Sequence, residues 1–229
     1  MKKNIIFISV AILIIVVLAV LSTLGGKEIK VEENMLNIEY PETGNEMTLN
    51  YDTENPVVAM YIENYGSIVM ELYPDIAKNT VNNFISLVKS GFYDNNTFHR
   101  LMRGFVLQGG DPTGEGSGGP GYSIKGEFSE NGYENNLSHT KGIVSMARAT
   151  ANDTAGSQFF ICLEDAKSLD GKYAAFGKII DGWDNVERIA KTETISDQTS
   201  GKLVKNLKIK KAVIDLKGKE YEEVEKVDD

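Results

Sequence analysis

Short apolar runs separated by turns dominate the chain between residues 56 and 216. The runs are rich in Val, Ile, Phe and Tyr, which favour strands, and several are bounded by glycine. PVVAMYIE and GSIVMELY are joined at Asn64 to Gly66, a spacing that predicts a β-hairpin. The pattern predicts eight strands, over residues 56–63, 66–73, 97–102, 105–110, 142–147, 157–163, 174–180 and 203–215.

Two segments have the spacing of an amphipathic helix. Their apolar residues recur three or four positions apart, which places them on one helical face. Many short strands with only two helices favour a closed barrel, because closure removes the exposed edges of the strands. The helical residues are Ala77, Val81, Phe84, Ile85 and Val88 before Gly91, and Trp183, Val186, Ile189 and Ala190.

A different pattern opens the chain. Residues 5–24 form an uncharged, mostly apolar run of 20 residues, preceded by Lys2 and Lys3. This length suffices for a helix that crosses a bilayer, and the lysines predict that the amino terminus stays inside. We therefore expect residues 1–24 to be a transmembrane anchor in the cell membrane, with the remaining chain outside the cytoplasm. A cleaved signal segment, which would leave a secreted protein, is the alternative, although only a poor cleavage site lies near Ser22–Gly25.

Acidic segments flank the predicted barrel. Residues 25–55 hold two lysines against eight acidic residues, and residues 217–229 hold three against six. Both read as solvated segments, a linker and a tail, which leaves 56–216 as one folded domain. That domain is nearly neutral and shows no basic face for nucleic acid. We expect a monomer, in which the single Cys162, set in an apolar run, is a buried structural thiol.

Candidate metal and cofactor motifs are weak. The chain has two histidines, His99 and His139, and neither belongs to a paired ligand motif, so no metal is expected. Residues 114–119 match G-x-G-x-x-G, but Pro120 and Gly121 follow where a helix should begin, so a loop is expected and no dinucleotide cofactor. No Ser-His-Asp or Cys-His set stands at a recognisable spacing.

Polar residues inside apolar strands are the stronger signal. In FHRLMRGFVLQGGD, residues 98–111, Arg100 would be costly to bury unless it is compensated. Each polar group could simply satisfy a neighbouring backbone group. Taken together, however, the alternation of side chains along strands favours an apolar cup with a polar rim, which is a binding site. The cup would be lined by Phe105, Val106 and Phe160, and its rim would hold Arg100, Gln108 and Gln158.

Three segments carry a resemblance to a known family. FHRLMRGFVLQGGD, SMARATANDTAGSQFFI and LDGKYAAFGKI resemble, in order and separation, the signature segments of the cyclophilin family of peptidyl-prolyl cis/trans isomerases. The similarity covers about residues 56–216, and the loop 147–156 resembles the bacterial form. It implies a mainly β fold, a closed eight-stranded antiparallel barrel capped by two helices, here preceded by one N-terminal hydrophobic helix.

The resemblance also implies roles for residues. Arg100 matches the catalytic arginine, and Gln108 matches the glutamine that steadies the arginine and the substrate. Phe105, which we count with these two as catalytic, belongs to the pocket for the proline ring. The other members of that pocket are Val106, Phe160 and Leu169, and the further wall positions are Ala147, Ala149 and Gln158.

Three more positions complete the expected site. Arg148 stands where many members of the family have asparagine, a tolerable departure because the backbone carries that position's role. Tyr173 replaces a frequent histidine at the pocket edge, which puts fine specificity in doubt but not the reaction. His99 precedes the arginine in the family too, where it supports the site, and we give it no proton-transfer role.

The implied function is cis/trans isomerisation of X-Pro bonds in exported proteins, which assists their folding. The expected partners are proline-containing segments of unfolded or partly folded proteins. No nucleophile, general base, metal or cofactor is needed for this reaction. The alternative is a non-catalytic proline-peptide binding module or holdase chaperone.

Overall fold

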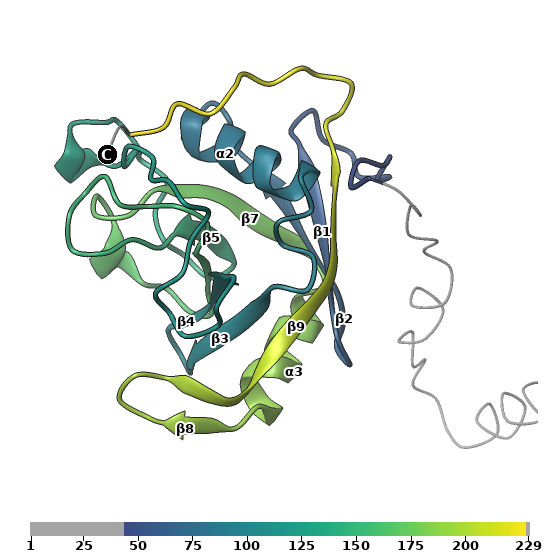
Figure 1. Cartoon of the computed structure of the whole chain (residues 1–229), viewed down its shortest axis with the longest axis vertical. Coiled ribbons are helices and arrows are strands. Elements are labelled where there is room, and N and C mark those ends of the chain that lie inside the picture. Colours follow the sequence, from purple (N-terminus) through teal and green to yellow (C-terminus); the bar gives the residue numbers. More distant parts are fainter. Residues whose placement is uncertain (1–43, 228–229) are drawn as a thin grey trace, which may run out of the picture. The chain divides into compact units, whose positions relative to one another are not determined.

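The computed structural model describes residues 44–227, so the predicted anchor at 5–24 and the first part of the linker lie outside the described residues. Within 44–227 the chain forms nine strands and two α-helices (Figure 1). Neither of these helices is long and apolar enough to cross a bilayer. The strands are β1 (Val57–Ile62), β2 (Gly66–Leu72), β3 (Thr97–Met102), β4 (Val106–Asp111), β5 (Ile143–Met146), β6 (Phe159–Cys162), β7 (Ala175–Asp181), β8 (Ile195–Asp197) and β9 (Lys202–Asp215).

Eight of these strands close into a barrel. Their order is β1-β2-β7-β5-β6-β4-β3-β9, and β9 pairs again with β1, so that the ring has no free edge. Each of these pairings is antiparallel. The predicted eight-stranded barrel is therefore confirmed. The short β8, which pairs only with β9, was not expected, because its three residues contain one apolar side chain.

Both predicted helices are present, as α2 (Lys78–Lys89) and α3 (Trp183–Thr192). Helix α2 buries the expected apolar face against the barrel. No side chain caps its N-terminus locally. Instead, the Glu127 carboxylate accepts the N–H groups of Asn79 and Thr80, at 3.0 and 2.7 Å. A carboxylate suits this position, since the first N–H groups of a helix lack intrahelical partners and carry its positive end.

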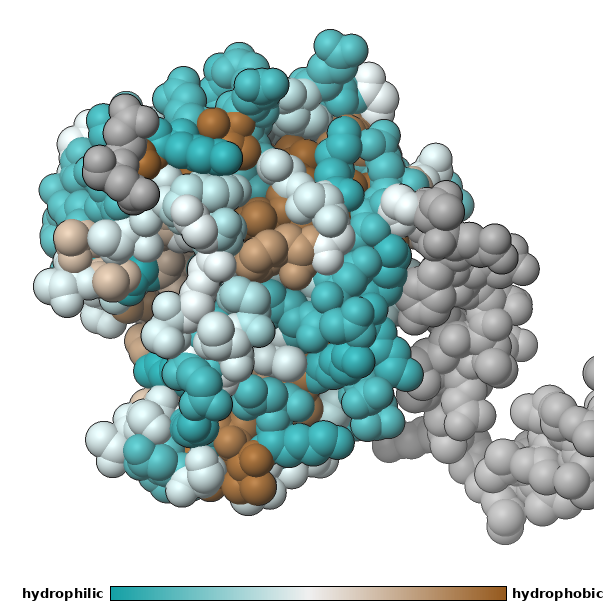
Figure 2. Space-filling view, viewed as in Figure 1, coloured by the Kyte–Doolittle hydropathy of each residue, from teal (hydrophilic) through white to brown (hydrophobic). Residues whose placement is uncertain are grey.

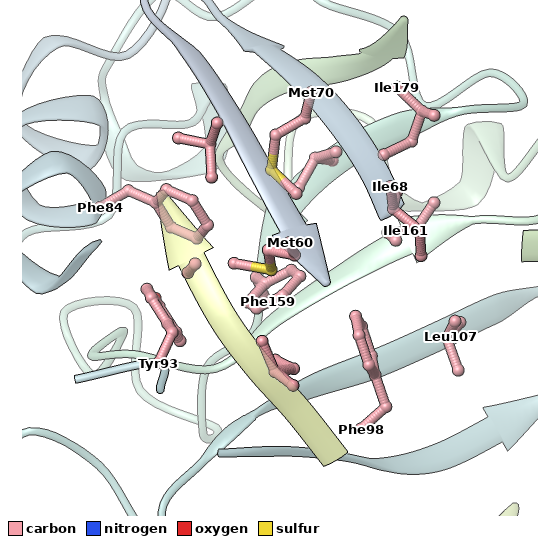
Figure 3. Close-up of a cluster of buried hydrophobic side chains, with 14 of the residues drawn as sticks. Met60, Ile68, Met70, Phe84, Tyr93, Phe98, Leu107, Phe159, Ile161 and Ile179 are labelled. Carbon is pink, nitrogen blue, oxygen red and sulfur yellow. The ribbon is translucent and has the colours of Figure 1, made fainter. Parts of the chain in front are cut away.

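Phe84 points from α2 into the core of the barrel (Figure 3). Its ring centroid lies 5.0 Å from those of Tyr93 and Phe176, and 5.4 Å from that of Phe159 in an edge-on arrangement. Such tilted and edge-on geometries suit the charge distribution of aromatic rings. Two methionines, Met60 of β1 and Met70 of β2, are fully buried in the same core.

Residues 44–55 correct the expectation of a solvated linker up to residue 55. Leu49 is buried, and with Met47 and Tyr51 it covers an apolar patch on the outside of β1, β2 and β9. The Leu49 N–H donates to Asp215 (2.7 Å), and Lys217 Nζ donates to the carbonyl oxygens of Leu49 and Tyr51. The acidic composition hid this packing, because three apolar side chains suffice to cover so small a patch.

The expected tail follows the surface of the domain over its described part. Tyr221 and Val224 lie against the main core, and Lys78 Nζ contacts Glu222 Oε1 at 2.6 Å. Eight of the eleven residues 217–227 are exposed, so only a few of its side chains pack on the domain. Cys162 is buried as expected, and burial raises the pKa of its thiol to about 12.

The surface of the face seen in Figure 2 is mostly hydrophilic, and apolar residues reach it in small, separate patches. Among residues 44–227, the large apolar side chains that are clearly exposed are Val204, Ile180 and Val227. Scattered apolar residues of this kind are normal on a folded domain. That the protein is a monomer stays a prediction.

Replacing Phe84 with alanine should lower the free energy of unfolding by about 3–5 kcal/mol, since the cavity it leaves is enclosed by other rings. Urea unfolding measures the change. Val204→Ala serves as the control, because this side chain is 65% exposed, and should change the free energy by less than about 0.5 kcal/mol. Equal effects of the two substitutions would show that the core is wrongly assigned.

Candidate active site

A β-bulge in β3 sets the direction of Arg100. Phe98 pairs with Gly109 and Arg100 pairs with Gln108, so His99 between them has no cross-strand partner. Without the bulge, Phe98 and Arg100 would face the same side of the sheet. With it, Phe98 faces the core, while Arg100 lies beside Gln108 outside the barrel. Bulges next to active sites commonly re-aim a side chain in this way.

The residues predicted to line the cup form an apolar cluster on the outer face of the barrel. Along β6, Phe159 and Ile161 belong to the inner core, whereas Phe160 and Cys162 belong to a second cluster outside it. The same alternation puts Val106 outside and Leu107 inside. The second cluster brings together the predicted residues Phe105, Val106, Ala147, Phe160, Leu169 and Tyr173.

Met102 and Leu137 also pack in this cluster and were not predicted. Met102 stands two residues after Arg100, so the alternation along β3 could have identified it. Leu137 lies in irregular chain, where no periodicity indicates the direction of a side chain. The cup is thus built from strand residues that alternation predicts and loop residues that it does not.

The predicted rim residues form a chain of hydrogen bonds. Arg100 Nη1 donates to Gln108 Oε1 at 3.0 Å, and Gln108 Nε2 donates to Gln158 Oε1 at 3.0 Å. Gln158 Nε2 in turn donates to the carbonyl oxygens of Gly116 and Gly118. The two glutamines therefore connect the arginine to the backbone of residues 114–121, which we term the glycine-rich loop.

Arg100 is held by neutral acceptors alone. Its Nε donates to the Ser200 carbonyl at 2.8 Å, on the loop between β8 and β9. Within residues 44–227 it makes no ion pair with a carboxylate. Burial lowers the pKa of Arg100 from its ordinary value, but a guanidinium remains charged at physiological pH. The orientation of the guanidinium is therefore fixed, and its positive charge remains available to a ligand.

A groove of about 490 Å³ adjoins the rim and shares Gln108 and Gln158 with it. One wall is the glycine-rich loop with Tyr122 and Ser123, and another is Ala147–Ala149. The N–H groups of Ala147 and Ala149 donate to Gln158 O and Thr154 Oγ1. Among the described residues the Arg148 N–H has no such acceptor, so it is free to donate to a bound peptide.

The side chain of Arg148, the departure from the family pattern, braces the loop after β5. Its guanidinium donates to the carbonyl oxygens of Lys172, Ala149 and Thr150. It also lies over the rings of Phe128 and Tyr173, at 5.0 and 4.9 Å from their centroids. The side chain therefore holds Tyr173 against the cup, while Ala149 itself is exposed at the edge of the groove.

Behind Phe160 lies a Ser-His-Asp arrangement that the sequence did not indicate. His139 Nε2 lies 3.0 Å from Ser145 Oγ, and its Nδ1 lies 2.9 Å from Asp170 Oδ1. The His139 ring stacks on Phe160 with the centroids 6.0 Å apart. Ser145 is fully buried, so no substrate reaches its hydroxyl. The arrangement positions the pocket ring and is not a nucleophilic triad.

His99 lies under the glycine-rich loop. It is 6% exposed, and a Cβ built on Gly116 would lie 3.8 Å from its Nε2. Neither ring nitrogen has a hydrogen-bond partner in the described part of the chain. Burial lowers the pKa of His99. A neutral histidine that packs beneath the loop agrees with a supporting position and not with proton transfer.

Comparison with known proteins agrees with this geometry. Residues 57–214 match the family model "Cyclophilin type peptidyl-prolyl cis-trans isomerase/CLD". The chain is 43% identical over 136 residues to peptidyl-prolyl cis-trans isomerase B of Bacillus subtilis. The matched region covers 59% of this chain and 92% of that protein. The chain is 45% identical over 144 residues to the peptidyl-prolyl cis-trans isomerase-like 1 of Gibberella zeae, covering 62% and 87%.

A similar solved structure is a cyclophilin-type isomerase of Cryptosporidium parvum, crystallised in the presence of the dipeptide Ala-Pro. It has a TM-score of 0.62 and 36% sequence identity, and the match covers 69% of this chain and 98% of that one. These matches show the class of enzyme, while the assignment of its site to the apolar cluster beside Arg100 stays a prediction. The chain belongs to the cyclophilin-type peptidyl-prolyl cis-trans isomerase family.

The pKa of both histidines predicts how stability depends on pH. Burial holds the pKa of His99 and His139 below the ordinary value of about 6.5. Below about pH 6.5 the unfolded chain binds protons that the folded chain does not. The free energy of unfolding should therefore decrease as the pH is lowered below about 6.5, and should keep its full value at higher pH. Urea unfolding at a series of pH values measures this.

His99→Gln should remove one of the two contributions and flatten the slope between about pH 5 and 6.5. The carboxylates with lowered pKa, such as Asp111 and Asp170, act at lower pH and do not obscure this window. Identical slopes for the two proteins would contradict the neutral, buried state of His99.

Proposed function

We propose that Arg100 is the group that lowers the barrier to rotation about the X-Pro bond. Amide resonance sets that barrier at about 18–20 kcal/mol. As the bond twists, the prolyl nitrogen becomes pyramidal and recovers its lone pair. A donor aimed at this nitrogen therefore interacts more strongly with the transition state than with either planar isomer, which is the condition for catalysis.

The hydrogen-bonded pair of Arg100 and Gln108 beside the apolar cup is the observation that carries this proposal. Nε and one N–H of Nη1 are committed to Ser200 and Gln108, which leaves the other guanidinium N–H groups for the substrate. Because the acceptors are neutral, they fix the direction of the guanidinium without cancelling its charge. Such preorganisation costs no rearrangement when the bond twists.

The remaining residues hold the substrate on either side of the bond. The proline ring fits the cup of Phe105, Val106, Phe160 and Leu169, which also excludes water and so strengthens the interaction with Arg100. The Arg148 N–H is the donor for a carbonyl oxygen of the peptide. The structural relative crystallised with Ala-Pro supports a proline-containing ligand of this kind.

We also propose that the substrates are exported proteins and that the chain works at the outer face of the cell membrane. The 20-residue apolar run and the lysines before it support an anchor. The isomerase would then meet unfolded or partly folded segments as they leave the membrane, and would assist their folding.

Arg100→Ala should lower kcat/KM for a short X-Pro peptide by roughly 100- to 1,000-fold, the loss typical of removing one preorganised donor. Peptide binding should weaken much less, since the cup remains, and stability should change by less than about 2 kcal/mol. Arg100→Lys should recover little, because an ammonium cannot present two donors in one plane. A coupled isomerisation assay measures the rate.

Arg103→Ala is the matched control. This exposed arginine lies in the turn after β3, and it donates to the carbonyl oxygens of Ala190 and Glu193 and not to the cup. The substitution should leave the rate within about twofold. An Arg100→Ala protein that is folded by circular dichroism and turns over at the wild-type rate would refute the mechanism. It would favour the alternative of a non-catalytic proline-peptide binding module or holdase chaperone.

The anchor makes a separate prediction. The full chain should sediment with membranes, and protease added to cells without an outer barrier should release a soluble, active domain. A chain that begins at residue 44 should remain in the soluble fraction. Recovery of free protein with its amino terminus near Gly25 would show instead that the segment is a cleaved signal peptide.

A further inference from the structure

Residues 217–227 form a segment that crosses α2 and that we term the C-terminal strap; it is yellow in Figure 1. The family match ends at residue 214, so the strap lies beyond the part of the chain shared with the family. Its beginning is fixed, because Lys217 donates to the carbonyl oxygens of Leu49 and Tyr51. The strap is therefore an addition to the domain with a defined course.

The middle of the strap is attached to α2. The side chain of Asn79 forms two hydrogen bonds with Glu225: its Nδ2 donates to the Glu225 carbonyl (2.8 Å), and its Oδ1 accepts the Glu225 N–H (2.9 Å). Lys78 contacts Glu222, and Tyr221 and Val224 pack on the core. The side-chain amide of Asn79 thus pairs with both the backbone N–H and the backbone carbonyl of Glu225.

The end of the strap reaches a wall of the groove beside Arg100. The Val227 N–H donates to the Ser123 carbonyl at 2.9 Å as part of an antiparallel bridge. The Lys226 ammonium lies 4.3 Å from the centroid of the Tyr122 ring. Tyr122 and Ser123 both line the groove, which also contains Gln108 of the rim. The last residues of the strap therefore contact the groove wall directly.

That wall needs such support because of its composition. The loop leading to it contains glycines at 114, 116, 118, 119 and 121, and glycine loses more conformational freedom on ordering than any other residue. Gln158 fixes the loop at Gly116 and Gly118. At its far end, Tyr122 donates to Asn83 of α2, and the strap supplies the backbone contact at Ser123.

We propose that the C-terminal strap is a positioning element for the substrate groove, through which Lys226 and Val227 hold Tyr122 and Ser123 in place for the peptide residues that flank the target proline. A wall that is already ordered binds these residues without the loss of conformational entropy that ordering the loop would require. This inference rests on the proposed function, in which the proline ring binds in the cup, and the strap makes no contact with the cup among the described residues. The strap should therefore affect long peptides and not short ones.

Two shortened proteins test this. A chain that ends at Glu225 lacks both wall contacts but keeps the contacts with α2, and a chain that ends at Val227 is the matched control. For an eight-residue peptide with a central Ala-Pro, ending at Glu225 should raise KM about five- to tenfold and leave kcat within about twofold. For a four-residue Ala-Pro peptide, KM and kcat should both stay within about twofold of the control.

Val227→Pro in the full chain is the second variant, since proline has no N–H to donate to Ser123. It should raise KM for the long peptide in the same direction without shortening the chain. Equal KM values for the long peptide in all these proteins would overturn the proposal. An equal loss of activity toward both peptides would overturn it too, because that result would show a general loss of structure and not a role in the groove.

Discussion

The strict alternation of side chains along closed strands is the constraint on which the site depends. In a closed barrel every strand has one face inside and one outside, so a single strand must supply both the core and the site. Phe159 and Phe160 show this directly, since one packs on Phe84 and the other forms the cup. A change that shifted the register of β6 by one residue would exchange the two rings, which makes stability and function inseparable at this strand.

The register is irregular at several places in the barrel, and the bulge at His99 is the one that directs Arg100. It lets Phe98 enter the core while Arg100 lies beside Gln108 outside. The hydrogen-bond acceptors of Arg100 determine how far the cost of its burial is compensated. A carboxylate partner would stabilise the guanidinium more, but it would also neutralise the charge that the twisted amide requires. A carbonyl and a side-chain amide compensate part of the desolvation and leave that charge in place.

The sequence predicted the regular and the alternating parts of the molecule. All eight barrel strands, both helices and the grouping of Arg100, Gln108 and Gln158 follow from periodicity and from polar residues in apolar runs, and the resemblance added Leu169 and Tyr173. What it missed depends on contacts between distant residues. The pairing of His139 with Ser145 and Asp170 joins residues whose spacing is that of no motif. The packing of residues 44–51 and of the strap involves few apolar side chains in acidic segments, where composition alone favours a solvated chain.

Backbone conformation and close packing together explain much of the glycine in the groove wall and also why the wall must be fastened. Gly114, Gly116 and Gly121 have positive φ angles, and a Cβ on Gly118 would lie 2.1 Å from Asp111 Oδ1, so these positions do not accept a side chain without strain or a shift. A loop selected for this close approach has few side chains of its own with which to hold itself. Polar groups from its surroundings replace them: the Asp111 carboxylate accepts the N–H groups of Thr113 and Gly116, and Gln158 donates to two carbonyl oxygens. These fastenings lie near the start of the loop. The hydrogen bond from Val227 acts at its far end, on Ser123, between the Tyr122 hydroxyl that donates to Asn83 and the Ile124 N–H that donates to the Ala155 carbonyl.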